Sequence, residues 1–278
     1  FQQVLLAKNK KGYQNLVKLS SLAYIEGNYG LYPRIDKDLI IEYREGLIAL
    51  SGGLRGEIPN LVLNVGETQA EEALKWWKDA FGDDFYLELN RHGIPEEDHL
   101  NQILNRFSSS YGIKTIAANE LFYLNQEDAK AHDVLICIKE NEKQSTPIGR
   151  GRGFRHGMVN DQYFFKSQEE MKVLFDDLPE AIENITALVS KIEHFELERE
   201  VLLPDFDIPE AFLNIQDRSD GGKRGENAYL RDLTYKGAKK RYEQIDDALT
   251  ERIDFELETI QNTGYPGYFL IVQDFTSK

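Results

Sequence analysis

The sequence of 278 residues has one cysteine, Cys137, and no long apolar run. A single thiol cannot form an internal disulfide, which excludes a disulfide-stapled secreted scaffold and favours a reducing compartment, with the cytoplasm as the expected location. The longest apolar stretches, residues 134–138 and 268–272, are far shorter than the roughly 20 residues of a membrane-spanning helix. We therefore expect no membrane partner.

Positive charge is also scarce. The chain has 33 Lys and Arg against 48 Asp and Glu, for a formal net charge of −15. This balance argues against a protein that wraps nucleic acid over its whole surface, but it allows a local basic patch. One stretch, residues 221–241, is basic, and its candidate nucleic-acid contacts are Lys236, Lys239, Lys240 and Arg241. A solvated helix face is the alternative interpretation.

Histidine is rare as well, and none of the five residues has the spacing of a zinc motif. His92 and His99 are seven residues apart, but Gly93 and Pro95 break the helix that would bring them to one face. We expect each histidine to be a surface residue or a satisfied core residue. The glycine- and arginine-rich loop at residues 149–157 lacks the strand-to-helix context of a phosphate-binding loop, so we expect a mobile hairpin tip there.

The first half of the chain alternates short apolar runs with helical patterns. Strands are predicted at residues 3–7, 47–50, 85–89 and 114–118, with amphipathic helices between them. Successive strand–helix units predict a parallel sheet, because a crossover helix is the usual connection between parallel neighbours. Four strands do not close a barrel. The first run begins at once, so we expect a piece of a longer protein.

The second half is mainly helical. Ser167 and Glu170 form a capping box, and Pro179 begins a further helix. Residues 203–220 contain prolines and few periodic apolar residues, which is typical of a linker, so we predict domains at residues 1–200 and 201–278. Helices are expected at residues 226–242 and 250–261.

Several segments together are specific: LLAKN at 5–9, PRID at 33–36, GLIALSG at 46–52, FYLEL at 85–89, DLPEA at 177–181 and GYPGYFLIV at 264–272. In this order the chain resembles the alpha subunit of bacterial DNA polymerase III, the C family of replicative polymerases. The resemblance implies an α/β fold: an incomplete, irregular (β/α) barrel of the polymerase-and-histidinol-phosphatase (PHP) type, then a mainly helical segment leading into the palm.

The same resemblance implies template-directed DNA synthesis in the longer parent enzyme, with Mg²⁺ as cofactor and primer–template DNA, a sliding clamp and a proofreading exonuclease as partners. The family's catalytic aspartates follow the last motif and lie beyond residue 278, so we expect no catalytic residue, no cofactor and no activity in this piece. Asp205 and Asp207 have the spacing of a metal-binding pair, but they lie in the predicted linker.

The resemblance also locates three ligand positions of metal-binding PHP domains within this chain. They are occupied by Gly53, Glu120 and Phe122, and neither glycine nor phenylalanine can ligate a metal ion. We therefore interpret the metal site as degenerate and the domain as a structural platform. Two other hypotheses remain: a stand-alone PHP-type metal-dependent phosphoesterase, and a non-enzymatic interaction module.

Overall fold

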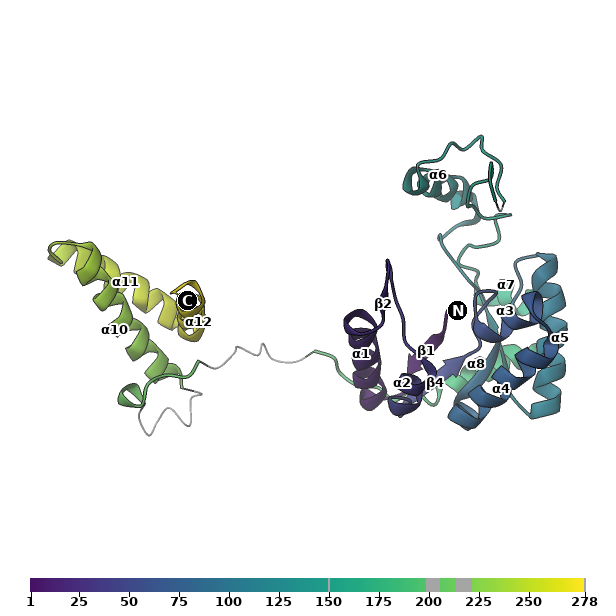
Figure 1. The fold of residues 1–278 in the computed structure, drawn as a ribbon, viewed down its shortest axis with the longest axis horizontal. Coiled ribbons are helices and arrows are strands. Elements are labelled where there is room, and N and C mark those ends of the chain that lie inside the picture. The colour runs from purple at the N-terminus through teal and green to yellow at the C-terminus, as the bar shows by residue number, and fades with distance from the viewer. Residues whose placement is uncertain (150, 199–205, 214–221, 278) are drawn as a thin grey trace. The chain divides into compact units, whose positions relative to one another are not determined.

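The computed structural model describes residues 1–149, 151–198, 206–213 and 222–277. The chain divides into two compact units, residues 1–195 and 196–278 (Figure 1). The predicted linker at 203–220 lies largely outside the described residues, so the boundary at residue 200 stays a prediction. No helix in the described part of the chain is both long enough and apolar enough to cross a membrane.

The first unit is built on a four-stranded sheet in the order β1-β4-β5-β6. Its strands are β1 (Val4–Ala7), β4 (Leu47–Leu50), β5 (Phe85–Asn90) and β6 (Thr115–Ala118). All four lie where the sequence predicted strands. β4, β5 and β6 are parallel, as expected.

The direction of β1 was predicted wrongly, because β1 pairs with β4 in the antiparallel sense. The connection from β1 to β4 contains further elements besides a single crossover helix. After α1 (Lys10–Ile25) come a small hairpin, β2 (Asn28–Tyr29) and β3 (Tyr32–Pro33), and the short helix α2 (Lys37–Glu42). These additional elements reverse the chain once more, so β4 starts beside the end of β1.

Side chains of the sheet alternate between two apolar layers. One face carries Leu47, Phe85 and Leu87 and packs under α3 (Glu57–Asn64), α4 (Glu67–Phe81) and α5 (Pro95–Tyr111). The other face carries Ile48, Tyr86 and Ile116 and packs against Leu188 of α8 (Pro179–Val189) (Figure 1). The sheet is therefore covered on both sides, as expected for parallel strands.

The remaining elements of this unit are α6 (Ala129–Glu140), α7 (Gln168–Leu174) and two 3₁₀ turns, η1 (Gly82–Asp84) and η2 (Gln126–Asp128). The capping box of α7 is confirmed, since Glu170 N donates to Ser167 Oγ at 3.2 Å and Ser167 N donates to Glu170 Oε2 at 2.7 Å. Cys137 is buried in α6, as expected for a small core residue.

Asp84 lies at the amino edge of the parallel strands and links the segment after β1 to the segment after α8. Its carboxylate accepts hydrogen bonds from Lys8, which follows β1, and from Lys191, which follows α8. Burial alone would raise the pKa of Asp84, but the hydrogen bonds from these two ammonium groups outweigh it and lower the pKa.

The second unit contains η3 (Glu210–Phe212) and three helices, α10 (Lys223–Arg241), α11 (Asp247–Thr263) and α12 (Pro266–Ser277). α10 packs against both α11 and α12, with Leu230, Ala238 and Leu270 buried. Tyr235 Oη donates to Asp254 Oδ1 at 2.6 Å and links α10 to α11. The predicted helices are confirmed, and the apolar run at 268–272 belongs to α12.

Candidate functional site

The carboxyl ends of β4, β5 and β6 meet at one edge of the sheet. In open α/β sheets this edge is where ligands bind. Ser51 and Gly53 follow β4, Glu88 and Asn90 end β5, and Glu120 follows β6. We call this group the edge site.

Glu88 and Asn90 share a sheet face with buried Tyr86, because alternate strand residues point to the same side. Ser51 Oγ accepts a hydrogen bond from Glu88 N at 2.9 Å, and Asn90 Nδ2 donates to Glu88 Oε1 at 3.0 Å. Burial raises the pKa of Glu88; the hydrogen bond from Asn90 opposes this effect, and the charge of Glu120 reinforces it. Glu88 is therefore a carboxyl group that holds its proton more strongly than usual.

The three predicted ligand positions all lie near this edge. A Cβ atom added at Gly53 would lie 3.3 Å from Asn90 Nδ2, so this position faces the edge site. Glu120 is close enough to Glu88 to affect its pKa. Phe122 stacks on His132, with 5.5 Å between ring centroids, and its backbone N donates to Tyr163 O at 2.9 Å. Of the three positions, only Glu120 has a side chain that could bind a cation, and their role as ligand positions stays a prediction.

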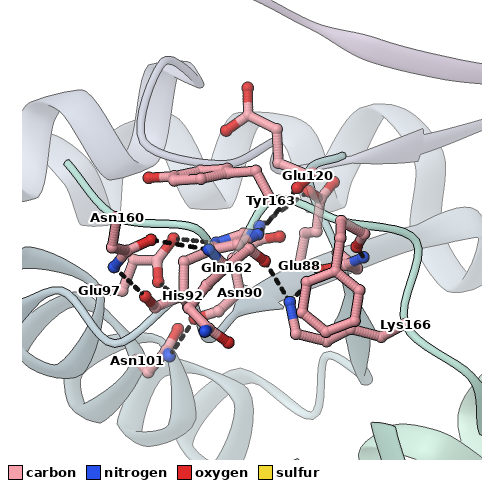
Figure 2. Close-up of polar contacts among 12 residues, drawn as sticks. Glu88, Asn90, His92, Glu97, Asn101, Glu120, Asn160, Gln162, Tyr163 and Lys166 are labelled. Carbon is pink, nitrogen blue, oxygen red and sulfur yellow. Dashed lines mark hydrogen bonds and ion pairs between the residues drawn. The ribbon is translucent and has the colours of Figure 1, made fainter. Parts of the chain in front are cut away.

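His92 is buried and both of its ring nitrogens have partners. Nδ1 lies 2.7 Å from Glu97 Oε1, and Nε2 lies 2.9 Å from the backbone oxygen of Glu120 (Figure 2). Glu97 Oε2 also accepts a hydrogen bond from His92 N at 2.6 Å. His92 is thus a satisfied core histidine, as expected. Its pairing with Glu97 was missed, and the only sequence signal is an acidic residue in the first turn of the following helix.

Residues 160–166 contact the His92–Glu97 pair and link it to Asn119, which follows β6. Asn160 Nδ2 donates to His92 O at 2.7 Å, and the ring of Tyr163 stacks on His92 with 4.4 Å between centroids. Burial raises the pKa of Tyr163 to about 12. Lys166 Nζ donates to Asn119 Oδ1 at 3.2 Å and to Gln162 O (Figure 2), and burial lowers the pKa of Lys166.

These residues do not fit the metal centre of a PHP-type phosphoesterase. Such chemistry needs two or three metal ions held by clustered His, Asp, Glu or Cys side chains. Within the described ranges, no group of three or more such side chains is placed to hold a metal ion. The imidazole of His92 is committed to Glu97 and to a carbonyl oxygen, and Gly53 and Phe122 offer no ligand atom. Asn90 Oδ1 is a buried acceptor with no partner among the described residues, but it is a single amide oxygen.

The glycine-rich loop was predicted to be a mobile hairpin tip, but one of its arginines, Arg155, is anchored to the rest of the unit. This side chain is buried and forms a two-point pair with Asp133 of α6, at 2.6 Å and 2.9 Å. Arg155 Nε also donates to Thr146 O at 2.9 Å. The hydrogen bond from Arg155 lowers the pKa of Asp133. Arg155 therefore joins the loop to α6, whereas Arg150 lies outside the described residues.

The basic candidates lie in the last turns of α10. Lys236, Lys239 and Lys240 are three and four residues apart, so they share one exposed helix face. Lys236 pairs with Asp232 at 2.6 Å, while Lys239 and Lys240 have no ion-pair partner among the residues described. Arg241 Nη1 donates to Gly237 O of its own helix at 3.3 Å. Their contact with nucleic acid stays a prediction. Of the Asp-x-Asp pair, Asp207 is exposed and Asp205 lies outside the described residues.

Comparison with protein families finds two matches. A PHP domain matches residues 1–92, and a domain described as the bacterial DNA polymerase III alpha NTPase domain matches residues 228–278. The first match lies within the first unit and the second within the second unit.

Curated relatives match nearly the whole chain. It is 42% identical over 276 residues to the DNA polymerase III subunit alpha of Borreliella burgdorferi, 34% identical over 276 residues to that of Treponema pallidum, and 39% identical over 284 residues to that of Aquifex aeolicus. These alignments cover 98–99% of this chain. The chain spans 22–23% of the length of these relatives.

Proposed function

We propose that this chain, a homologue of bacterial DNA polymerase III alpha subunits over nearly its whole length, is the PHP-containing part of a replicative DNA-directed DNA polymerase. In the parent enzyme, Mg²⁺ would support nucleotidyl transfer to a primer in the cytoplasm. The resemblance implies that the catalytic aspartates of the parent enzyme follow the GYPGYFLIV motif at 264–272. The proposed role of this part is structural, as a platform that supports the palm and contacts replisome subunits such as the proofreading exonuclease and the sliding clamp.

One observation supports the structural role: polar side chains at the edge site are hydrogen-bonded to other groups of the same unit. The His92–Glu97 pair is held by residues 160–166, and Glu88 is bound by Asn90. A hydrolytic centre needs free ligand atoms around an open position. Here the side chains of Glu88, His92 and Glu97 are hydrogen-bonded within the protein, and the carboxylate of Glu120 alone is a poor metal site. Such a network favours a rigid support. An irregular barrel, with its boundary near residue 200, is part of the same proposal.

Metal binding by the full chain tests this role. Thermal unfolding is measured with Mn²⁺, Zn²⁺ or chelator, alongside hydrolysis of a model phosphomonoester. We expect the same unfolding temperature in all three conditions and no metal-dependent hydrolysis. A clear increase in unfolding temperature with either ion, lost in Glu88→Gln or Glu120→Gln, would support the phosphoesterase hypothesis instead.

The polymerase assignment has its own test. With any divalent metal, the chain alone should neither extend a primer nor remove 3′ nucleotides. Extension that disappears in Asp205→Asn would overturn the linker interpretation of residues 203–220. An interaction module unrelated to replication would instead leave DNA synthesis unchanged when this region is deleted from the parent subunit.

The exposed lysines of α10 support a second element of the proposal, contact with primer–template DNA. Lys239 and Lys240 lie beside Lys236 on one face, and the cations of this helix stand out in a chain with a net charge of −15. The alternative is that these cations only complement the carboxyl end of the helix dipole. Salt dependence separates the two, because phosphate contacts release counterions and intrahelical effects do not.

A further inference from the structure

The first unit carries a second surface, formed by α1 and the β2–β3 hairpin, that the proposed function does not use. It consists of three tyrosines and four cations: Tyr24, Tyr29, Tyr32, Lys10, Lys11, Lys18 and Arg34. We call it the α1–hairpin face. All seven side chains are exposed. The surface lies on elements other than those of the edge site and α10.

The sequence of α1 explains why these residues face outward. Gly12, Asn15, Leu19 and Ala23 recur every three or four residues and are buried against the unit. Gly12 comes so close to Gly46 that an added Cβ atom would lie 1.9 Å from Gly46 O. This close packing fixes the rotation of the helix. Lys10 and Tyr24 therefore lie on the opposite, outward side.

The hairpin continues this surface. Tyr29 and Tyr32 are direct partners across the two short strands, so their rings lie on the same side of the ribbon. Both strands contact α1. The exposed fractions of Tyr24, Tyr29 and Tyr32 are 64%, 72% and 70%. The guanidinium carbon of Arg34 lies 4.8 Å from the ring centroid of Tyr29, which shows that this ring already receives a planar cation on its face.

This surface is locally basic in an acidic chain, as α10 also is. Residues 9–34 contain four cations and one anion, Glu26, for a net charge of +3, whereas the whole chain has −15. Within the described part of the chain, none of Lys10, Lys11 and Lys18 has an ion-pair partner. The lysines lie along α1, and the tyrosines lie at its carboxyl end and in the hairpin that follows it, where Arg34 contacts Tyr29. An anionic ligand with planar groups complements both features.

We propose that the α1–hairpin face binds single-stranded nucleic acid. The lysine ammonium groups would contact successive phosphates, and unstacked bases would lie on the rings of Tyr24, Tyr29 and Tyr32. Aromatic platforms beside a basic groove are the general means by which proteins hold single strands without reading sequence. A duplex offers the phosphates but keeps its bases stacked, so single strands should bind in preference. This inference goes beyond the proposed platform role and does not require it.

Fluorescence anisotropy with the full chain tests the proposal. The probes are a labelled oligo-dT strand and a duplex of the same length, each titrated between about 50 and 200 mM salt. One variant replaces Tyr24, Tyr29 and Tyr32 by Ala, and another replaces Lys10, Lys11 and Lys18 by Ala. A comparison variant replaces Lys236, Lys239 and Lys240, the candidate contacts on α10, by Ala and removes the same charge. All substituted side chains are exposed, so thermal unfolding should confirm unchanged folding.

We expect the tyrosine variant to lose at least about fivefold in single-strand affinity and little in duplex affinity. The lysine variant should lower the log–log salt slope for the single strand by about 2, since each phosphate contact contributes about 0.7. Equal single-strand affinity in the tyrosine variant and the unsubstituted chain overturns the proposal. A loss of single-strand affinity confined to the α10 variant also overturns the proposal, because it would support the α10 contact alone. A change in self-association without a change in DNA affinity would identify the surface as a protein contact and also overturn it.

Discussion

Replacing Glu97 by Ala should strongly destabilise the first unit. The substitution removes the acceptor of two short hydrogen bonds, from His92 N at 2.6 Å and from His92 Nδ1 at 2.7 Å. It leaves a buried backbone N–H and a buried imidazole nitrogen without partners. Each unsatisfied buried group costs about 1–3 kcal/mol, so the expected loss is about 3–5 kcal/mol, similar to that for breaking other buried pairs.

Tryptophan fluorescence during urea unfolding measures this loss. The chain has two tryptophans, Trp76 and Trp77, and both lie in α4, so their emission reports on the first unit. The matched control is Glu96→Ala, since Glu96 is an exposed acid in the same helical turn. Its effect should stay within about 1 kcal/mol, the size of a helix-dipole contribution.

Glu97→Gln provides an intermediate case, because it keeps the shape of the side chain and one acceptor oxygen. We expect a smaller loss than with Ala, since one hydrogen bond to His92 survives. If Glu97→Ala unfolds at the same urea concentration as Glu96→Ala, the buried pair does not support the edge site, and the argument for a rigid platform fails.

Three further predictions concern other regions. Gly12→Ala should destabilise the first unit by about 1–3 kcal/mol in the same urea assay, because the new methyl group would overlap Gly46 O, whereas Ser20→Ala on the exposed side of α1 should have little effect. The lowered pKa of Asp84 means that its stabilising effect is present above the unfolded-state pKa of about 3.9 and is lost as pH falls through the folded-state pKa. Asp84→Asn should therefore lower the unfolding temperature at neutral pH and flatten its decline below about pH 4; an unchanged pH profile would contradict this. In the full-length parent, three lysines of α10 are replaced by Ala: Lys236, Lys239 and Lys240. The log–log salt slope of primer–template binding should fall by roughly 3 without a change in base preference. An unchanged slope would identify a solvated helix face.

The sequence was sufficient to locate the four strands of the sheet and most of the long helices. Short apolar runs identified three of the strands, alternation identified β5, and helical periodicity with glycine stops identified α4 and α5. The direction of β1 could not be obtained in this way. It depends on a hairpin whose strands have two residues each and on the six-residue helix α2, and such short elements carry no detectable period.

The edge site was predictable in position but not in its internal contacts. The resemblance pointed to Gly53, Glu120 and Phe122, which lie around the carboxyl edge. The pairing of His92 with Glu97 spans the turn at Gly93 and the start of α5 at Pro95, so no helical spacing reveals it. The contacts of Asn160 with His92 and of Lys166 with Asn119 join residues 68 and 47 positions apart, and they depend on tertiary packing, which local sequence pattern does not encode.

The antiparallel direction of β1 also determines how charge is divided between the two ends of the sheet. Because β1 runs against its neighbours, Lys8 emerges at their amino edge, where it meets Asp84. A parallel β1 would have placed this ammonium group at the carboxyl edge, the end of the sheet where Glu88 and Glu120 lie. Instead, Glu88 is left with the amide of Asn90 and the repulsion of Glu120. The orientation of one four-residue strand thus gives the two ends of the sheet different charge environments: ammonium groups bind Asp84 at the amino edge, and Glu88 and Glu120 lie at the carboxyl edge.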